Sequence, residues 1–477
     1  MSRPFSINVA WIAASSLVEN VTSILIFFLV ARIVGTEAFG IAAMAFAFLF
    51  LGEFLVRDTV TEAIIERQTL EEGRLEATFA VLFGVALLVV LTLCLLAPLI
   101  ARLYGEPDVA PLLMAGSPAI LFIGASGVST ALLRRGQEFR TLAIRDALAV
   151  VVGGLVCLAL ALGGFGAWSL IAQRAVQVGT SATLSIVAAG WVPRRVPAKS
   201  EFALVRGLGP SVVLLRTTSL IITQTPTVAL GYFANPVAVG LYALAFRLVE
   251  IVSRLAVFPL RGVAQSALAD LRRRTGVTAH FFLDVTQITA LLSFTAFAGL
   301  AVIAKPAVLL VIGPDWIGAA EILPYLCFAG AVNSLVAIQE AYVLSIDYLR
   351  RFLYAGMIEA AIGIPLIAVA ATYGLTAAAA AVLARSLIAF YFRTRVARAA
   401  EVISWSRYLS NLATPFVVAV GMALAVGLWG EVVDGHAGDL VVVATSILLG
   451  TVCAVGLVVV VMPDTATRLL NLVRRRE

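Results

Sequence analysis

The sequence predicts an all-α polytopic membrane protein of about 14 transmembrane helices, on three observations. Hydrophobic residues make up 61% of the 477 residues and charged residues only 13%, whereas soluble domains have about 45–50% and about 25%. The mean hydropathy is +1.02. The apolar residues form runs of about 20, which is the length of a membrane-spanning helix and about twice that of a barrel strand. These observations exclude a soluble enzyme, a disordered chain and a secreted disulfide scaffold.

The apolar runs give the candidate spans in order along the chain. They cover roughly residues 8–33, 38–56, 78–101, 109–132, 143–162, 166–191, 208–232, 237–265, 281–303, 319–345, 352–371, 375–395, 406–428 and 440–462. The first run is longer than the apolar core of a signal peptide and no small-residue cleavage site follows it. We therefore expect it to be a membrane span.

The basic residues predict the topology. If the N-terminus is cytoplasmic, an even number of spans places most of the 34 Lys and Arg residues in cytoplasmic segments. The outside loops then hold only Arg32, Arg102 and Lys305. This positive-inside bias predicts a multi-pass membrane protein with both termini in the cytoplasm. The basic loops are explained by topology and by anionic lipid, and we expect no nucleic acid partner.

Cofactor and metal chemistry leave no signature in the sequence. The four cysteines all lie within apolar runs, and the two histidines lie at or beyond span ends, which is not a metal-ligand or disulfide pattern. The chain contains no Walker motif for ATP. We expect no catalytic residues, no metal and no cofactor, apart from H⁺ or Na⁺ as a candidate coupling ion.

Two halves of the chain resemble each other. At an offset of 200, Gly40 corresponds to Gly240, within the matching segments 30–46 and 230–246. At an offset of 210, Arg140 corresponds to Arg350, and Gly164 to Gly374. Because each half has six spans, both halves share one orientation, as in repeats related by a pseudo-two-fold axis along the membrane normal. We predict an N-lobe over residues 1–200, a C-lobe over 201–400, and two additional helices with a basic cytoplasmic tail over 401–477.

The eighth span carries three arginines at intervals of seven residues, Arg247, Arg254 and Arg261. This spacing places them along one helix face, together with Glu250. One interpretation is an ion-pair ladder that only stabilises the bundle. The other is a cationic wall that lines a substrate cavity, because charges at membrane depth usually face a protein interior or a wet cavity.

Other intramembrane residues are candidates for substrate binding and motion. Arg216 lies in the seventh span, where Pro226 predicts a kink that is either static or a hinge. Arg174 and Arg385 lie at similar depths in the sixth and twelfth spans, where either a structural role or substrate contact fits the pattern.

Carboxylates within the spans are candidates for ion coupling. A buried acid either carries a proton, holds Na⁺ or serves as a structural hydrogen-bonded group. The candidates for coupling are Glu19, Glu53 and Glu250. The basic residues of the C-lobe favour an anionic substrate such as a diphosphate-linked lipid, because the guanidinium group binds phosphoryl oxygens in pairs.

Three stretches resemble a known family. LVARIVGTEAFGIAAMA (29–45), LLRRGQEFRTLA (132–143) and LALGGFGAWSL (160–170) are similar to segments of Wzx-type polysaccharide flippases, with most similarity to the WzxC-like branch. These flippases belong to the multidrug/oligosaccharidyl-lipid/polysaccharide exporter superfamily. The resemblance implies two six-helix lobes, alternating access, and transfer of an undecaprenyl-diphosphate-linked oligosaccharide to the outer leaflet for surface or exopolysaccharide export. It also implies a location in the bacterial inner (plasma) membrane, with membrane lipid, a polysaccharide polymerase and export machinery as partners.

Two alternatives remain at this point. One is a related exporter, either a lipid II flippase or a cation-coupled drug antiporter. The other, from a different class, is a membrane-embedded polysaccharide polymerase or ligase, which would place its chemistry on a sizeable outside loop. The loop over residues 431–439 has acids and a histidine but no basic partner.

Overall fold

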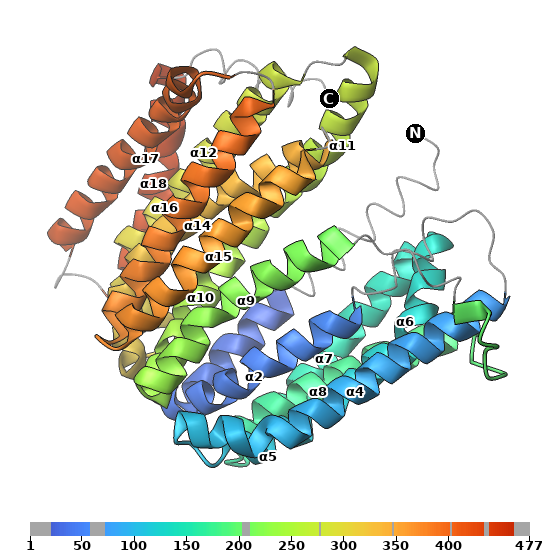
Figure 1. Cartoon of the computed structure of the whole chain (residues 1–477). Coiled ribbons are helices and arrows are strands. Elements are labelled where there is room, and N and C mark those ends of the chain that lie inside the picture. The colour runs from blue at the N-terminus through green and yellow to red at the C-terminus, as the bar shows by residue number, and fades with distance from the viewer. Residues whose placement is uncertain are drawn as a thin grey trace. The chain divides into compact units, whose positions relative to one another are not determined.

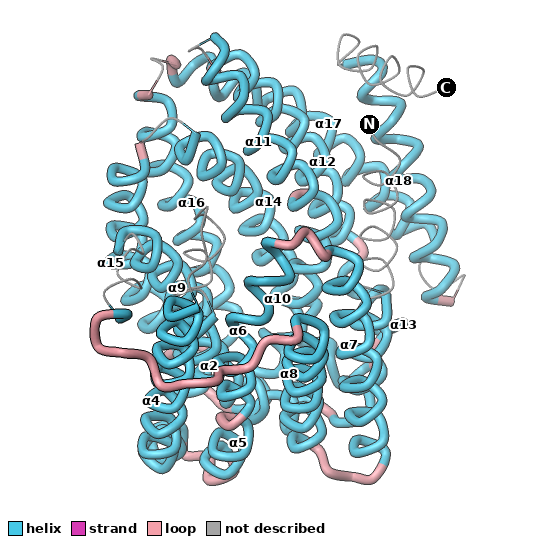
Figure 2. The backbone as a smooth tube through the Cα atoms, turned by 90° about the vertical axis from the view of Figure 1, so that its right-hand side faces the viewer, coloured by secondary structure: helices cyan, strands magenta, loops and turns pink. Residues whose placement is uncertain are grey.

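The computed structural model describes residues 21–57, 72–202, 210–275, 278–345, 348–400, 403–433 and 438–461. All regular secondary structure in this part of the chain is helical (Figure 2). Eleven of its helices are long and apolar enough to cross a membrane. Together with the shorter apolar helix Val21–Val34, α8 (Ala167–Ala189) and α9 (Pro210–Phe233), they give at least one helix within each predicted span. The all-α polytopic prediction is confirmed.

The described residues divide into two compact units, Met1–Gly240 and Leu241–Glu477. The helices of the first unit are α2 (Thr36–Arg57), α4 (Glu72–Tyr104), α5 (Val109–Gly116), α6 (Ala119–Arg135), α7 (Phe139–Leu162), α8 (Ala167–Ala189) and α9 (Pro210–Phe233). Within it, α8 packs against both α6 and α7, and α2 packs against α9 (Figure 1). The helix α9, which corresponds to the seventh predicted span, therefore contacts α2, which corresponds to the second.

The second unit contains most of α10 (Pro236–Ala256) and the helices that follow it. These are α11 (Phe258–Thr275), α12 (Ala279–Val302), α13 (Ala304–Val311), η2 (Pro314–Trp316), α14 (Ile317–Ser345), α15 (Leu349–Ala371), α16 (Leu375–Ala399), α17 (Trp405–Val433) and α18 (Asp439–Val461). Its core lies between α12, α14, α16 and α17, where Phe282 stacks on Tyr342 at 4.2 Å. The buried Gln339 amide donates hydrogen bonds to Thr394 and Tyr408 in this core.

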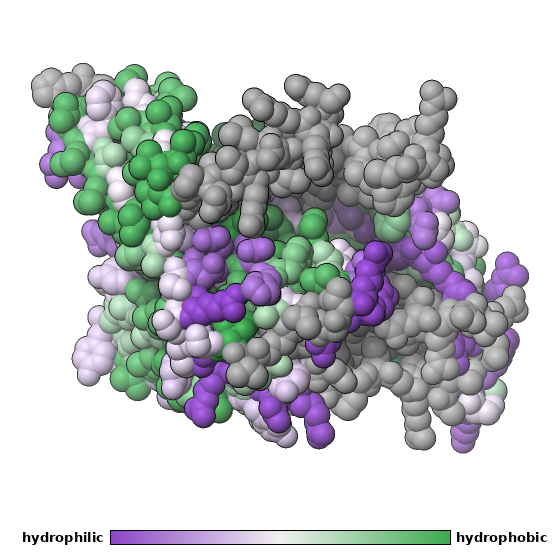
Figure 3. Space-filling view, turned by 90° about the horizontal axis from the view of Figure 1, so that it is seen from above, coloured by the Kyte–Doolittle hydropathy of each residue, from purple (hydrophilic) through white to green (hydrophobic). Residues whose placement is uncertain are grey.

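Large apolar side chains also cover the outside of the units. Leu95 of α4 is 80% exposed and Val460 of α18 is 78% exposed, and apolar residues occupy much of the described surface in Figure 3. In water such a surface would drive aggregation. In a bilayer it faces acyl chains, as expected of a chain with this composition.

The structure corrects the prediction of a single helix through residues 237–265. The helix α10 ends at Ala256 and α11 begins at Phe258, so Arg261 lies on a different helix from Arg247. The physical cause is Pro259, which has no N–H to donate to the carbonyl of residue 255 and whose ring crowds the preceding turn. The residues on both sides of this break are apolar, so a hydropathy profile does not predict where α10 ends.

The repeat is visible in the helix boundaries. The helices α2 and α10 begin at Thr36 and Pro236, at the offset of 200, and α7 and α15 begin at Phe139 and Leu349, at the offset of 210. One pairing is wrong by two residues: the glycine that precedes α8 is Gly166, and this residue, not Gly164, corresponds to Gly374 before α16. Both have positive φ, 51° and 102°, so glycine suits each turn.

Gly40 and Gly240 lie against each other. A Cβ atom on Gly40 would lie 1.8 Å from the carbonyl oxygen of Pro236, and one on Gly240 would lie 2.2 Å from the carbonyl oxygen of Thr36. Thr36 and Pro236 are themselves related by the offset of 200. The contact is thus reciprocal, which is the geometry of a local two-fold axis between these helix ends, and only glycine permits so close an approach.

The segment that follows α8 packs back on the first unit (Figure 2). The Trp191 ring lies 6.0 Å from the Phe79 ring of α4, and the Arg194 backbone N–H donates to Glu76 at 2.9 Å. Further along, Glu201 accepts hydrogen bonds from the Arg195 side chain and from the Ala198 backbone. These bonds favour the carboxylate and lower the pKa of Glu201.

Replacing Gly40 with Ala should destabilise the first unit by about 1–3 kcal/mol, because the new methyl group overlaps a backbone oxygen. The measurement is the thermal unfolding midpoint of the purified protein in detergent. The matched control is Gly84→Ala in α4, where a Cβ meets nothing within 4 Å. That variant should keep or raise the midpoint, since Ala favours helix by about 1 kcal/mol. Equal losses in both variants would contradict the reciprocal contact.

Candidate functional site

Five arginines that the sequence places within spans have described side chains, and all five lie beside carboxylates; they are Arg174, Arg247, Arg254, Arg261 and Arg385. Four groups result: Arg174 with Glu53; Arg247 and Arg254 with Glu250; Arg261 with Glu340; and Arg385 and Arg393 with Glu359. This pairing follows from the cost of charge at membrane depth, which an opposite charge and hydrogen bonds offset.

In the first unit, Arg174 of α8 binds Glu53 of α2. Its Nε donates to Glu53 Oε1 at 2.9 Å and its Nη2 donates to Oε2, so the pair is bidentate. The guanidinium group also lies 5.5 Å from the Phe50 ring centroid. Glu53 is only 5% exposed. The pair holds two helices together, and the coupling role predicted for Glu53 and the substrate role predicted for Arg174 stay predictions.

In the second unit, Glu250 bridges two arginines of its own helix. We call Arg247, Glu250 and Arg254 the α10 triad. Arg247 Nη1 donates to Glu250 Oε2 at 2.7 Å, and Arg254 donates to Oε1 through Nη2 at 2.7 Å and Nε at 3.1 Å. The i+3 and i+4 spacings allow this on one helix face, as the sequence predicts. The side chains are 26%, 29% and 44% exposed, in chain order.

Arg261 does not extend the α10 triad. Its Nη2 lies 2.9 Å from Oε1 of Glu340, which belongs to α14. The break at Pro259 thus gives Arg261 a different partner, and it joins α11 to α14.

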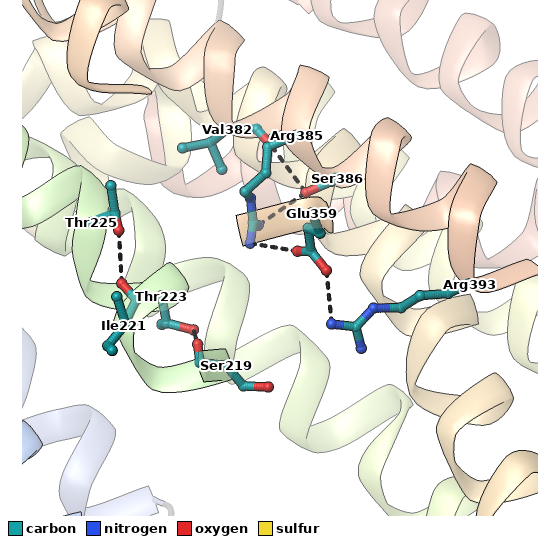
Figure 4. A network of polar contacts seen from close by, with 9 residues as sticks. All are labelled: Ser219, Ile221, Thr223, Thr225, Glu359, Val382, Arg385, Ser386 and Arg393. Carbon is teal, nitrogen blue, oxygen red and sulfur yellow. Dashed lines mark hydrogen bonds and ion pairs between the residues drawn. The ribbon is translucent and has the colours of Figure 1, made fainter. Parts of the chain in front are cut away.

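A second arginine–carboxylate group lies between α15 and α16. We call Glu359, Arg385 and Arg393 the α15–α16 cluster (Figure 4). Arg385 Nη1 lies 3.2 Å from Glu359 Oε1 and Arg393 Nη2 lies 2.7 Å from Oε2. Their side chains are 12%, 8% and 5% exposed for Arg385, Arg393 and Glu359.

Two glycines of α15 make room for the α15–α16 cluster. A Cβ on Gly363 would lie 2.5 Å from Arg385 Cγ, and one on Gly356 would lie 3.2 Å from Arg393 Nη2. Gly356, Glu359 and Gly363 follow each other at intervals of three and four residues, so they share one helix face. The pattern of charges along the chain does not predict that Glu359 and Arg393 share one site, although the glycine spacing around this acid is a signal for it.

Side-chain exposure distinguishes the α10 triad from the α15–α16 cluster. The α10 triad keeps a quarter or more of each side chain exposed, whereas the α15–α16 cluster is nearly enclosed. Arg385 donates hydrogen bonds to Glu359 and to the hydroxyl of Ser386, and its predicted contact with substrate stays a prediction.

Two predicted residues are described only in part or not at all. Glu19 lies outside the described residues, and so does the side chain of Arg216, which belongs to α9. Pro226 lies inside α9, where the hydroxyls of Thr223 and Thr225 donate to the carbonyls of Ser219 and Ile221 (Figure 4). Such bonds often bend helices. The hinge stays a prediction. In the described part of the chain, no three His, Cys, Asp or Glu residues form a metal-binding group.

Comparisons with known proteins agree with this architecture. Residues 29–321 match the family model described as "Polysaccharide biosynthesis protein". The chain is 26% identical over 310 residues to the succinoglycan biosynthesis transport protein ExoT of Rhizobium meliloti (strain 1021), covering 64% of this chain and 62% of that protein. It is 23% identical over 312 residues to the lipopolysaccharide biosynthesis protein WzxC of Escherichia coli (strain K12), with the same coverage. The chain therefore spans 62% of the length of both relatives.

Solved structures share the fold. The lipid II flippase MurJ in an inward closed conformation aligns with a TM-score of 0.76 at 15% identity, over 95% of this chain and 99% of that chain. An inward-facing multidrug resistance MATE family transporter of the MOP superfamily aligns with a TM-score of 0.57 at 15% identity, over 81% and 96%. At these identities the likeness establishes the fold.

Replacing Glu359 with Gln should destabilise the second unit by about 3–5 kcal/mol, because two nearly enclosed arginines lose their counter-charge. Thermal unfolding in detergent measures the loss. The matched variant is Glu340→Gln, whose pair with Arg261 is more exposed, so its loss should be about 1 kcal/mol or less. A loss at Glu340 as large as that at Glu359 would show that burial does not set the strength of these pairs.

Proposed function

Because this chain belongs to the polysaccharide biosynthesis protein family, we propose that it is a flippase for a lipid-linked glycan. Its substrate would be an undecaprenyl-diphosphate-linked oligosaccharide repeat unit. The chain would move this unit from the cytoplasmic to the outer leaflet of the inner membrane by alternating access, for surface or exopolysaccharide export. The family, the membrane-spanning helices and the transport relatives support this proposal.

The observation that carries the proposal is the α10 triad. Two arginines at membrane depth remain partly exposed although they share a carboxylate. A charged side chain at membrane depth lowers the stability of the protein. A role in binding substrate would explain why these two arginines are present and remain partly exposed. The planar guanidinium group matches phosphate oxygens in bidentate pairs and keeps its charge at every physiological pH. A diphosphate therefore suits this site better than a cationic drug.

In the proposed mechanism, Arg247, Arg254 and Arg216 bind the diphosphate from the cytoplasmic side. The lipid tail stays in the bilayer while the sugars pass through a polar cavity. Alternating access requires the binding site to open to one side of the membrane and then to the other. Pro226 would allow α9 to bend during this change. Arg174 and Arg385 are secondary candidates for substrate contact.

Coupling and assembly complete the proposal. H⁺ or Na⁺ would drive the cycle through Glu19, Glu53 or Glu250. Both termini would lie in the cytoplasm, and a polysaccharide polymerase and export machinery would receive the product.

Replacing Arg216, Arg247 and Arg254 together with Gln should reduce glycan export by about tenfold or more, because each charged hydrogen bond contributes about 1.5–3 kcal/mol. The measurement is surface polysaccharide in a strain that lacks the wild-type gene, with protein levels in the membrane matched. The control is Arg273→Gln, an exposed residue of the last turn of α11, which should export normally. Normal export by the triple variant would overturn the arginine assignment.

Loss of the gene tests the substrate class separately. The proposal predicts loss of surface polymer together with accumulation of intact lipid-linked repeat units on the inner leaflet. Normal polysaccharide with altered sensitivity to cationic dyes would instead indicate a drug antiporter.

A further inference from the structure

We propose that Glu250 is an internal counter-ion which a phosphate group displaces, so that the α10 triad takes up one proton when it binds a diphosphate. This inference rests on the proposed function and states how diphosphate binding at the same site would depend on pH. Anion binding and proton binding would be positively linked, and Glu250 would be the residue that links them.

The hydrogen bonds of the triad occupy the groups that a diphosphate needs. Arg254 directs both Nε and Nη2 at Oε1 of Glu250, at 3.1 and 2.7 Å. This edge of the guanidinium group is one that binds a phosphate in bidentate fashion. Arg247 Nη1 is held by the other carboxylate oxygen at 2.7 Å. Glu250 therefore competes with any phosphate for the same N–H groups.

Displacement changes the protonation of the carboxylate. A phosphate that takes the arginine N–H groups leaves Glu250 without its hydrogen-bond donors and beside a second anion. Two adjacent anionic groups disfavour each other's charged form. One proton from solvent converts the carboxylate to the acid, which removes the repulsion and supplies an O–H donor for a phosphate oxygen. The O–H bond of the acid forms as the bond between this proton and its donor, hydronium or a buffer acid, breaks, and no other covalent bond changes.

The charged groups on the helices next to α10 have partners of their own or lie far along those helices, so the exchange of Glu250 for phosphate involves the triad alone. Glu250 is paired with Arg247 and Arg254 on its own helix. The helix α16 also faces α10, because Arg385 acts electrostatically on Tyr242, and Arg385 is itself paired with Glu359. The helix α14 packs against α10 at Val249 and Gly330. Of the acids on α14, Glu340 is paired with Arg261, and Glu321 lies in the first two turns of the helix, far along it from Gly330.

The α15–α16 cluster shows what an arginine–carboxylate group looks like when exchange is blocked. It has the same composition, two arginines and one glutamate, but its side chains are at most 12% exposed and two glycines fit them against α15. The α10 triad is less enclosed, with side chains that are 26–44% exposed. The same chemistry therefore serves packing in one place and accessible binding in the other.

The experiment is isothermal titration calorimetry of the purified full chain in detergent with farnesyl diphosphate, in buffers of different ionisation enthalpy. The buffer dependence gives the number of protons taken up per ligand. Near neutral pH the wild-type protein should take up about one proton more than Glu250→Gln, and its affinity should fall by up to about tenfold per pH unit as pH rises. Glu250→Gln should bind with a weaker pH dependence, and protons taken up by the ligand itself cancel in the comparison.

Two further variants make the outcome decisive. Glu250→Asp keeps an acid in place and should retain the proton uptake, which separates titration from damage to the fold. Glu321→Gln removes an exposed acid of α14 and should retain it as well. Equal proton counts in the wild-type protein and Glu250→Gln would overturn the inference while the export assays still decide the function. Absence of farnesyl diphosphate binding by the wild-type protein would overturn the triad as a diphosphate site and this inference with it.

Discussion

The cost of placing a guanidinium group at membrane depth shapes much of this structure. Each arginine described there needs a carboxylate, and the carboxylate is often on another helix. Arg174 and Glu53 thereby join α8 to α2, Arg261 and Glu340 join α11 to α14, and Glu359 joins α15 to α16. In an apolar solvent the hydrophobic effect does not choose between neighbouring helices. Ion pairs between helices therefore help to determine which helices pack against each other.

Much of the fold could be predicted from the sequence because a bilayer requires apolar helices of a minimum length. The predicted spans correspond to helices, and the repeat at Gly40 and Gly240 reappears as a contact. The break at Val257 could not be predicted from hydropathy, because the apolar run continues through it. Only the missing N–H of Pro259 marks the position, and other helices of this chain contain proline without ending, as α9 does at Pro226.

The candidate site was predictable only where it is local. Spacing along one helix suffices to bring Glu250 between Arg247 and Arg254, since side chains three and four residues apart are neighbours. The contacts of Arg174 and Arg385 with Glu53 and Glu359 depend on which helices pack together, and spacing along the chain does not contain that information. Exposure likewise depends on packing, so the difference between an accessible and an enclosed arginine–carboxylate group appears only in the structure.

The reciprocal contact of Gly40 with Gly240 has a consequence for the origin of the chain. An interface in which each side presents the same residues to the other is isologous, the type that two identical subunits form in a homodimer. A half-length ancestral protein could make this contact between two separate copies. Fusion of the duplicated genes would then replace an association that depends on concentration by an intramolecular one, and each half could diverge afterwards. Arg247 and Arg254 of α10 correspond in sequence to Ala47 and Phe54 at the offset of 200. Such a difference between the two halves is expected after divergence.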